Sequence, residues 1–184
     1  MTEQPPRPQT IHNALRSIPH ATWVLTCKHE QFRDGIITKW VQQCSVEPPM
    51  LVVAIPKGRA IEPMLRHARA FALCMVQPTD KQVQRLFGRD HEKEDDPFLA
   101  LTTTTAATGM PILKQSLAWF DCKLEGHLSP DADCRLYLGH VVEACVLDAK
   151  VLPTNAAQGI TPPSHEDRRT PRSRSSRVAT NYKE

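Results

Sequence analysis

Residues 35–61, GIITKWVQQCSVEPPMLVVAIPKGRAI, carry the strongest structural signal in the chain. They begin with the short β-branched run Gly35–Thr38 and continue to the apolar run Met50–Ile55, which Pro56 stops. The length and valine content of the second run are typical of a buried strand rather than a helix. Between the two runs lies the polar segment Thr38–Ser45, which is either a surface loop or a ligand cradle offering hydroxyl and amide groups.

The basic turn Lys57-Gly58-Arg59 follows the buried run directly and precedes a predicted helix start. A glycine at this place lets the backbone approach a ligand closely. A helix N-terminus beside two cations suits a phosphate group. On local features alone, a solvated turn is the alternative interpretation.

Further from this stretch, short strand-like runs alternate with a few helices. Strands are predicted at Ala21–Cys27, Ala70–Val76, Ser116–Leu124 and Arg135–Leu147, with Gly139 marking a bulge or bend in the last. Helices are predicted at Thr10–Ile18 with Thr10 as its cap, at Ile61–Ala68 with Pro63 in its first turn, and at Thr79–Phe87 with a Thr79/Gln82 capping box and Gly88 at its end. Many short strands with few helices predict a mainly β protein built as a barrel rather than from βαβ layers.

The chain of 184 residues is long enough for one domain with flanking segments. We expect a flexible N-terminal arm over residues 1–9, a single domain over 10–160, and a disordered basic tail over 161–184. The tail is rich in Arg, Ser and Pro and holds six Lys/Arg against three Asp/Glu, a net charge of +3. Because the whole chain also carries +3, the body is neutral, and nucleic-acid binding is expected at most through the tail.

Several protein classes are excluded by motifs that the sequence lacks. The seven glycines are never closer than 13 residues apart, so neither a G-x-G-x-x-G fingerprint nor a P-loop exists. No secretory signal or apolar run long enough to span a membrane is present, so we expect a cytoplasmic protein. The six cysteines form no C-x-x-C pair and are expected to be reduced core residues, with no metal site.

Taken in order, the segments resemble the flavin reductase-like domain family, whose fold is the FMN-binding split barrel. The most distinctive match is the Gly-x-x-Thr stretch at Gly35–Thr38 that leads to Ser45-Val46-Glu47-Pro48-Pro49. Other matching segments cover about residues 11–150 and are Ala14–Pro19, Trp23–Thr26, Lys57–Arg59, Phe71–Leu73, Gly109–Leu113, Leu117–Cys122 and Leu136–Val141.

The resemblance implies a homodimer that holds FMN near the subunit interface. By position, Thr38, Lys39, Trp40 and Val41 would line the isoalloxazine ring. Ser45, Lys57 and Arg59 would hold the ribityl phosphate, and Gly58 would allow its close approach. Lys39 either offsets the negative charge that a reduced flavin carries near N1 and the C2 carbonyl, or faces solvent. Trp40 either stacks on the ring or packs in the dimer core.

The chain departs from the family pattern in two places. Members that reduce flavin with a nicotinamide often carry Gly-Asp-His before the closing strand, and this chain reads Ala132-Asp133-Cys134. Lys39 and Trp40 stand where many members have small polar residues. His20 and His140 either approach the flavin or are structural histidines.

Two functions from different classes follow from the resemblance. The first is an oxidoreductase that passes hydride from NAD(P)H to FMN and electrons onward to free flavin, oxygen, a metal chelate or a partner protein. The second is an FMN-binding module without turnover that serves as an electron relay or sensor. The sequence identifies no catalytic residue for either.

Overall fold

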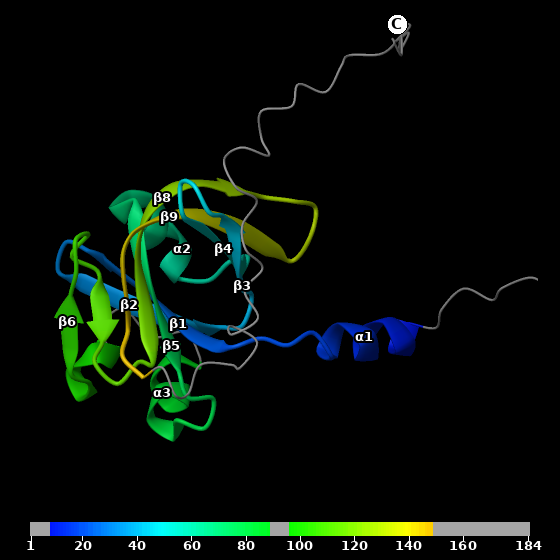
Figure 1. The fold of residues 1–184 in the computed structure, drawn as a ribbon, viewed down its shortest axis with the longest axis horizontal. Coiled ribbons are helices and arrows are strands. Elements are labelled where there is room, and N and C mark those ends of the chain that lie inside the picture. The colour runs from blue at the N-terminus through cyan, green and yellow to red at the C-terminus, as the bar shows by residue number, and fades with distance from the viewer. Residues whose placement is uncertain (1–7, 89–95, 149–184) are drawn as a thin grey trace, which may run out of the picture. The chain divides into compact units, whose positions relative to one another are not determined.

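The runs predicted as strands join one antiparallel sheet in the computed structural model, which describes residues 8–88 and 96–148 (Figure 1). Among these residues the seven-stranded sheet has the order β2 (Phe32–Thr38), β1 (Thr22–His29), β5 (Ala70–Val76), β8 (Ala118–Leu128), β9 (Cys134–Val146), β4 (Met50–Pro56) and β3 (Val41–Ser45). A second, two-stranded sheet pairs β6 (Thr103–Thr105) with β7 (Pro111–Leu113). The predicted mainly β architecture is therefore confirmed.

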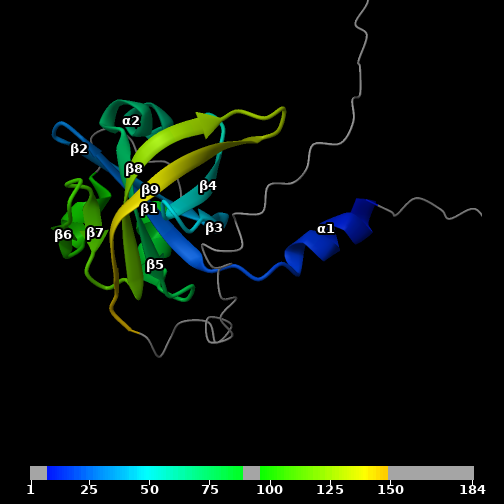
Figure 2. The same cartoon turned by 45° about the horizontal axis from the view of Figure 1, so that its top comes forward.

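The sheet rolls into a barrel because its two edge strands are consecutive in the chain. β2 and β3 stand at opposite ends of the strand order, yet only Lys39 and Trp40 lie between them. The edges therefore have to adjoin, and two hydrogen bonds hold them there. Ala54 N–H donates to the Trp40 carbonyl at 2.9 Å, and Thr38 Oγ1 donates to the Ala54 carbonyl at 3.2 Å. Figure 2 shows the resulting roll of strands from a second side.

The barrel interior is filled by residues that alternate along the strands with outward-facing ones. Along β4, Leu51, Val53 and Ile55 are buried, whereas Met50, Val52 and Ala54 are partly exposed. Phe71 and Tyr137 are among the largest fully buried side chains. This alternation separates a core face of β4 from an outer face, which decides where the site residues point.

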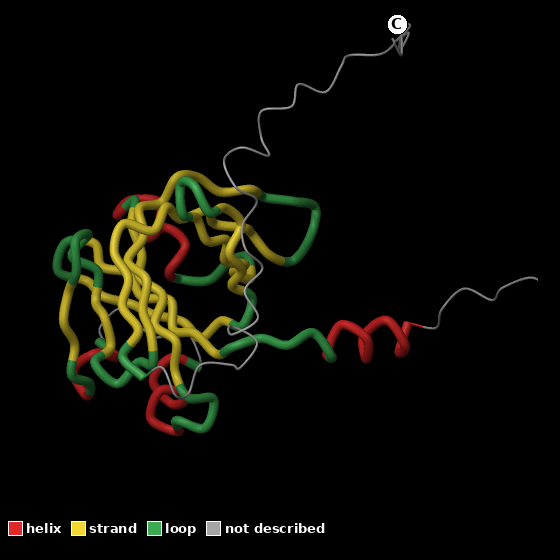
Figure 3. Tube along the Cα trace, in the orientation of Figure 1, coloured by secondary structure: helices red, strands yellow, loops and turns green. Residues whose placement is uncertain are grey.

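Within the described ranges the chain also forms three α-helices and a 3₁₀ turn, drawn in red in Figure 3. They are α1 (Pro8–Arg16), α2 (Ile61–Ala68), α3 (Lys81–Phe87) and η1 (Pro97–Ala100). The bounds predicted for α2 are confirmed, and its Ile61 and Leu65, one turn apart, are fully buried. Burial of this apolar stripe is what holds such a short helix in place.

Both predicted N-caps are wrong, although both helices exist, and the predicted end of α3 at Gly88 is confirmed. α1 begins at Pro8, so Thr10 lies inside the helix rather than at its cap. α3 is capped by Asp80 rather than Thr79, because the Asp80 carboxylate accepts hydrogen bonds from the backbone N–H groups of Gln82 and Val83. An aspartate one residue later satisfies the same open N–H groups and adds a favourable charge at the N-terminal end.

Two strand features differ from the prediction. The polar segment ends in a strand, β3, which pairs with β4 only and so tolerates polar residues on its open side. Gly139 does sit beside a bulge, but the extra residue is Glu125 of the partner strand β8. A Cβ at position 139 would lie 2.5 Å from Phe71 Cζ, so the glycine is required by close packing. The predicted tail and most of the predicted arm lie outside the described residues.

Four of the six cysteines are core residues, as predicted. Cys27, Cys74 and Cys122 are fully buried, and burial raises the pKa of each thiol to about 12. Cys44 is exposed and Cys145 is half-buried, so the prediction is wrong for these two. The three fully buried thiols stay protonated at neutral pH and behave as small apolar side chains.

Candidate functional site

A cavity of about 950 Å³ lies along the line where β2 and β3 adjoin, and we call it the seam pocket. On one side it is lined by the outer face of β4 and by Leu136 of β9. On the other side lie the β2–β3 connection and the N-terminal segment that contains α1. Its size is in the range of small-molecule and cofactor sites.

The β2–β3 connection is held in one conformation by the buried side chain of Thr38. Thr38 Oγ1 donates to the Ala54 carbonyl and accepts from Trp40 N–H at 3.3 Å. With the backbone of the connection fixed in this way, the side chains of Lys39 and Trp40 are presented outward, and Trp40 is 58 % exposed. A tryptophan left so exposed beside a cavity is available to cover an aromatic ligand.

A second cavity of about 530 Å³ lies at the start of α2, and we call it the helix pocket. It is lined by the turn residues Gly58 and Arg59, by α2, and by His127 and Arg135 of the β8–β9 hairpin. Arg135 stands opposite Ile55 in the β4–β9 ladder, and Ile55 points into the core. Since Ala54 and Pro56 line the seam pocket, the two pockets lie on opposite faces of the β4–β9 pair.

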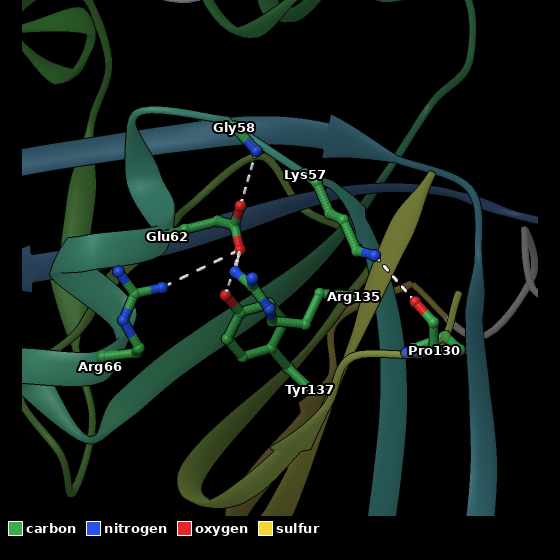
Figure 4. Close-up of polar contacts among 7 residues, drawn as sticks. All are labelled: Lys57, Gly58, Glu62, Arg66, Pro130, Arg135 and Tyr137. Carbon is green, nitrogen blue, oxygen red and sulfur yellow. Dashed lines mark hydrogen bonds and ion pairs between the residues drawn. The ribbon is translucent and has the colours of Figure 1, made fainter. Parts of the chain in front are cut away.

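The Lys57–Arg59 turn is fixed by contacts to the β8–β9 hairpin and to α2, as Figure 4 shows. Lys57 donates through its backbone N–H to the Asp133 carbonyl and through Nζ to the Pro130 carbonyl, both at 2.8 Å. Gly58 has a φ of 85°, a conformation that other residues rarely adopt. No atom lies within 4 Å of where its Cβ would be, so backbone conformation rather than crowding requires the glycine.

Glu62 is the buried centre of a polar cluster beneath this turn (Figure 4). Its side chain is 5 % exposed, accepts from Gly58 N–H at 2.8 Å and from Tyr137 Oη at 2.7 Å, and also accepts from Arg135. Arg66, one turn along α2, lies 4.0 Å away. Burial alone would raise the pKa of Glu62, but the hydrogen bonds from Tyr137 and Gly58 and the charge of Arg135 outweigh it and hold the pKa below its ordinary value.

The lowered pKa of Glu62 makes a testable contribution to acid stability. A carboxylate whose pKa is lower in the folded than in the unfolded state stabilises the fold fully above the unfolded pKa of about 4.3. That contribution disappears as the pH falls through the folded value. We expect urea midpoints of wild type and Glu62→Ala to differ most at pH 7 and to converge between about pH 4 and pH 2. A gap that stays constant over this range would contradict the assignment.

The residues predicted as one site are distributed over two places. The seam pocket contains Thr38, Lys39, Trp40 and Val41, so the structure brings together all four residues assigned to the ring. Gly58 and Arg59 line the helix pocket instead. Ser45, at the end of β3, and Lys57 line neither pocket, although Lys57 directly follows Pro56 of the seam pocket.

Some residues that line the pockets were not singled out in the sequence. His12 and Arg16 join His20 in the seam pocket, and His20 was a candidate whereas the other two were not. Their spacing of four residues on a predicted helix would have placed them on one face. Glu62, Arg135 and Tyr137 meet only because the register of β4 with β9 sets them beside α2, which no local pattern reveals.

Two other residues singled out in the sequence, His140 and Cys134, line neither pocket. His140 has Glu125 as its ion-pair partner, with 3.7 Å between Nδ1 and Oε1. Cys134, at the place of the family histidine, is buried, and its pKa is raised by burial and by its contact with Asp133.

Over residues 8–88 and 96–148, no three His, Cys, Asp or Glu side chains gather in a way that could hold a metal. Within the same ranges no helix has the length and apolar character needed to cross a membrane.

Comparison with known proteins extends these observations. The family model described as flavin reductase like domain matches residues 15–156. Diflavin flavoprotein A 1 of Synechocystis is 27 % identical over 119 residues, which are 64 % of this chain and 21 % of that protein. The chain therefore spans about a fifth of the length of this relative.

Two solved structures share the fold. An NADH:FAD oxidoreductase of Streptomyces globisporus superposes with a TM-score of 0.68 at 18 % identity, covering 79 % of this chain and 89 % of that one. An FMN-binding protein of Thermus thermophilus superposes with a TM-score of 0.67 at 23 % identity, covering 83 % and 85 %. With the family match over most of the described residues, the chain belongs to the flavin reductase-like domain family.

Proposed function

We propose that the chain is an FMN-binding oxidoreductase that takes hydride from NAD(P)H and passes electrons to a second acceptor. The observation that carries the proposal is the seam pocket, a mainly apolar cavity that is also lined by cationic side chains and by all four residues predicted to contact the flavin ring. The family membership and the names of the relatives support it. A bound flavin would supply the ring that accepts hydride at N5 and releases electrons singly or in pairs.

The chain's own residues would bind and orient this ring. Apolar side chains such as Val41 and Leu136 suit the body of an isoalloxazine, and Trp40 is exposed enough to stack on it. The ammonium of Lys39 would stabilise negative charge near N1 and the C2 carbonyl. These features fit a flavin, because an aromatic body with a developing negative charge needs apolar contact and a nearby cation.

The three residues predicted to hold the phosphate, Ser45, Lys57 and Arg59, do not gather at one pocket. Lys57 follows a residue of the seam pocket, whereas Arg59 lines the helix pocket on the other face. With the ring in the seam pocket, Lys57→Ala is expected to raise the FMN dissociation constant about 10- to 100-fold, since a charge-assisted phosphate contact contributes about 1.5–3 kcal/mol. Arg59→Ala, on the other face, should leave the dissociation constant near the wild-type value. Fluorescence titration with FMN measures the effect.

Two controls sharpen this test. Riboflavin lacks the phosphate, so its affinity should not change in either variant. Lys81→Ala removes an exposed lysine of α3 that lines neither pocket, and FMN affinity should stay at the wild-type value. If neither Lys57→Ala nor Arg59→Ala weakens FMN binding, the phosphate is held elsewhere.

The oxidoreductase proposal is tested by purifying the protein, loading it with FMN and mixing it anaerobically with NADH or NADPH. Loss of the flavin colour with either donor supports turnover. A preparation that neither carries nor binds FMN would contradict the proposal at its first step.

The second candidate is an FMN-binding electron relay or sensor without nicotinamide turnover. It is favoured by Cys134, which stands where family members that use a nicotinamide often carry a histidine. A buried thiol with a raised pKa cannot supply the contact that the imidazole would make to the nicotinamide. In the anaerobic test, a flavin that binds but keeps its colour with both donors selects this candidate.

A homodimer is also proposed, since Trp40 at the barrel seam and Val46 just after β3 are large apolar side chains left exposed. Light scattering coupled to gel filtration gives the mass directly. A monomeric mass at micromolar concentration would contradict the dimer.

A further inference from the structure

Helix α1 carries an apolar stripe that stays exposed within the described part of the chain. Ile11 and Leu15 stand four residues apart on one face of the helix, and a turn continues this face to Ile18, whose N–H donates to the Leu15 carbonyl at 3.3 Å. The three side chains are 50, 60 and 57 % exposed, and every residue from Thr10 to His20 is exposed. Large apolar side chains at this spacing normally face a core.

A helix as short as α1 depends on packing for its stability. It has nine residues, and isolated helices of fewer than about 12–15 residues are marginal in water. Two contacts shape the residues after it: Ser17 Oγ donates to the Ala14 carbonyl at 2.7 Å, and His20 Nδ1 lies 2.9 Å from the Ile18 carbonyl. Both join residues of this N-terminal segment, so neither holds the stripe against the barrel. The stripe therefore needs a cover that the described part of one chain does not supply.

The stripe is continuous with the exposed surface of the barrel seam. Leu15 and Ile18 line the seam pocket together with Trp40, which is also more than half exposed. With Ile11, these side chains expose on the order of 500 Å², near the upper end of the largest apolar patch on a typical monomer. Two copies that each bury this patch would remove on the order of 1,000 Å² from water, which is the area that a specific interface needs.

Charge and composition favour a second copy as the cover. Residues 1–160 carry no net charge, so two copies can approach each other without long-range repulsion. The sequence of residues 161–184 is polar and basic, and it has the same sign of charge as Arg16 and Lys39, which line the seam pocket. A second copy offers what this segment lacks, an apolar surface around Trp40.

We propose that in the dimer each α1 packs its stripe on the seam of the second copy, so that each seam pocket is walled by residues from two chains. The inference rests on the proposed homodimer and goes beyond it by naming the segment that is exchanged. A two-fold dimer makes this contact twice, because the same surface is used on both copies. The flavin site proposed at the seam is then complete only in the dimer, and FMN binding is coupled to association.

Leu15→Asp in the full chain tests the contact, because Leu15 is the middle residue of the stripe. The dimer dissociation constant from sedimentation equilibrium is expected to rise at least about 100-fold, since each dimer loses two leucine contacts and buries two charges instead. Hydrogen exchange of the α1 amides should be slow in the wild-type dimer, and fast both in the diluted monomer and in Leu15→Asp. Leu15→Met keeps the size and apolar character and should behave as wild type.

Leu99→Asp is the matched control. Leu99 is 81 % exposed, lies in η1 and lines neither pocket, so the same new charge there should leave the dimer dissociation constant unchanged. Trp40→Ser should weaken the dimer as Leu15→Asp does. Because the two side chains meet across the proposed interface, the effects of the two substitutions should not add. Circular dichroism melting checks that all variants are folded.

The exchange data identify what covers the stripe. Slow exchange of α1 in the monomer would overturn the inference, because the stripe would then be covered within one chain. Fast exchange of α1 in the wild-type dimer, or additive effects of Leu15→Asp and Trp40→Ser, would also overturn it. A chain that binds FMN but stays monomeric at all concentrations would overturn the inference and leave flavin binding intact. A dimer with slow α1 exchange that binds no FMN would support the inference and overturn the proposed function.

Discussion

Replacing Glu62 with alanine is expected to lower the free energy of unfolding by about 3 kcal/mol at pH 7. The substitution removes the acceptor of three hydrogen bonds and leaves the Arg135 guanidinium without its counter-charge. Removing one partner of a buried ion pair costs about 3–5 kcal/mol. Because Arg135 is 22 % exposed, the lower end of that range applies. Urea denaturation at constant protein concentration measures the change.

A double-mutant cycle with Tyr137→Phe isolates one contact of the cluster. Tyr137 Oη donates to Glu62 at 2.7 Å from a fully buried ring, so the two losses should not add. Glu125→Ala is the control, because Glu125 is exposed and its partner His140 is 3.7 Å away. It should change stability by less than about 1 kcal/mol. Equal effects at positions 62 and 125 would show that the cluster is not a stabilising centre.

Replacing Gly139 with alanine is expected to cost about 2–3 kcal/mol. The new Cβ would lie 2.5 Å from Phe71 Cζ and 3.0 Å from Cys122 Cβ, and both neighbours are fully buried. Inserting a methyl group into a filled core forces side chains and backbone to shift, which costs about 1–3 kcal/mol. Phe71 is fully buried, so its ring cannot move out into solvent and the upper end is expected.

Gly126→Ala provides the matched control for this prediction. Gly126 lies in β8, and no atom is within 4 Å of its hypothetical Cβ. The same substitution there should leave the thermal midpoint within a few degrees of wild type. A Gly139→Ala variant as stable as Gly126→Ala would mean that Phe71 yields to the added methyl group.

Local patterns in the sequence were sufficient for most of the strands and for α2. The run Met50–Ile55 and the bounds of Ala70–Val76 and Ile61–Ala68 could be predicted because apolar periodicity, β-branched content and a proline stop all act over neighbouring residues. The four ring residues, Thr38 to Val41, could be grouped because they are consecutive in the chain. The predicted N-caps were wrong, Thr79 by one residue and Thr10 because α1 already begins at Pro8, since several polar residues near a helix start can satisfy the same N–H groups.

The sequence by itself determined that this chain is a mainly β protein with a polar connection between two strands and a basic turn after a third. Only the tertiary structure decided that the connection closes the barrel and that Gly58 and Arg59 of the basic turn line a pocket on the other side of the β4–β9 pair. The same holds for the Glu62 cluster and for the seam pocket, which bring together residues far apart in the chain. Such contacts depend on strand register and on how far the sheet rolls, and both are set by packing of the whole core rather than by any local run of residues.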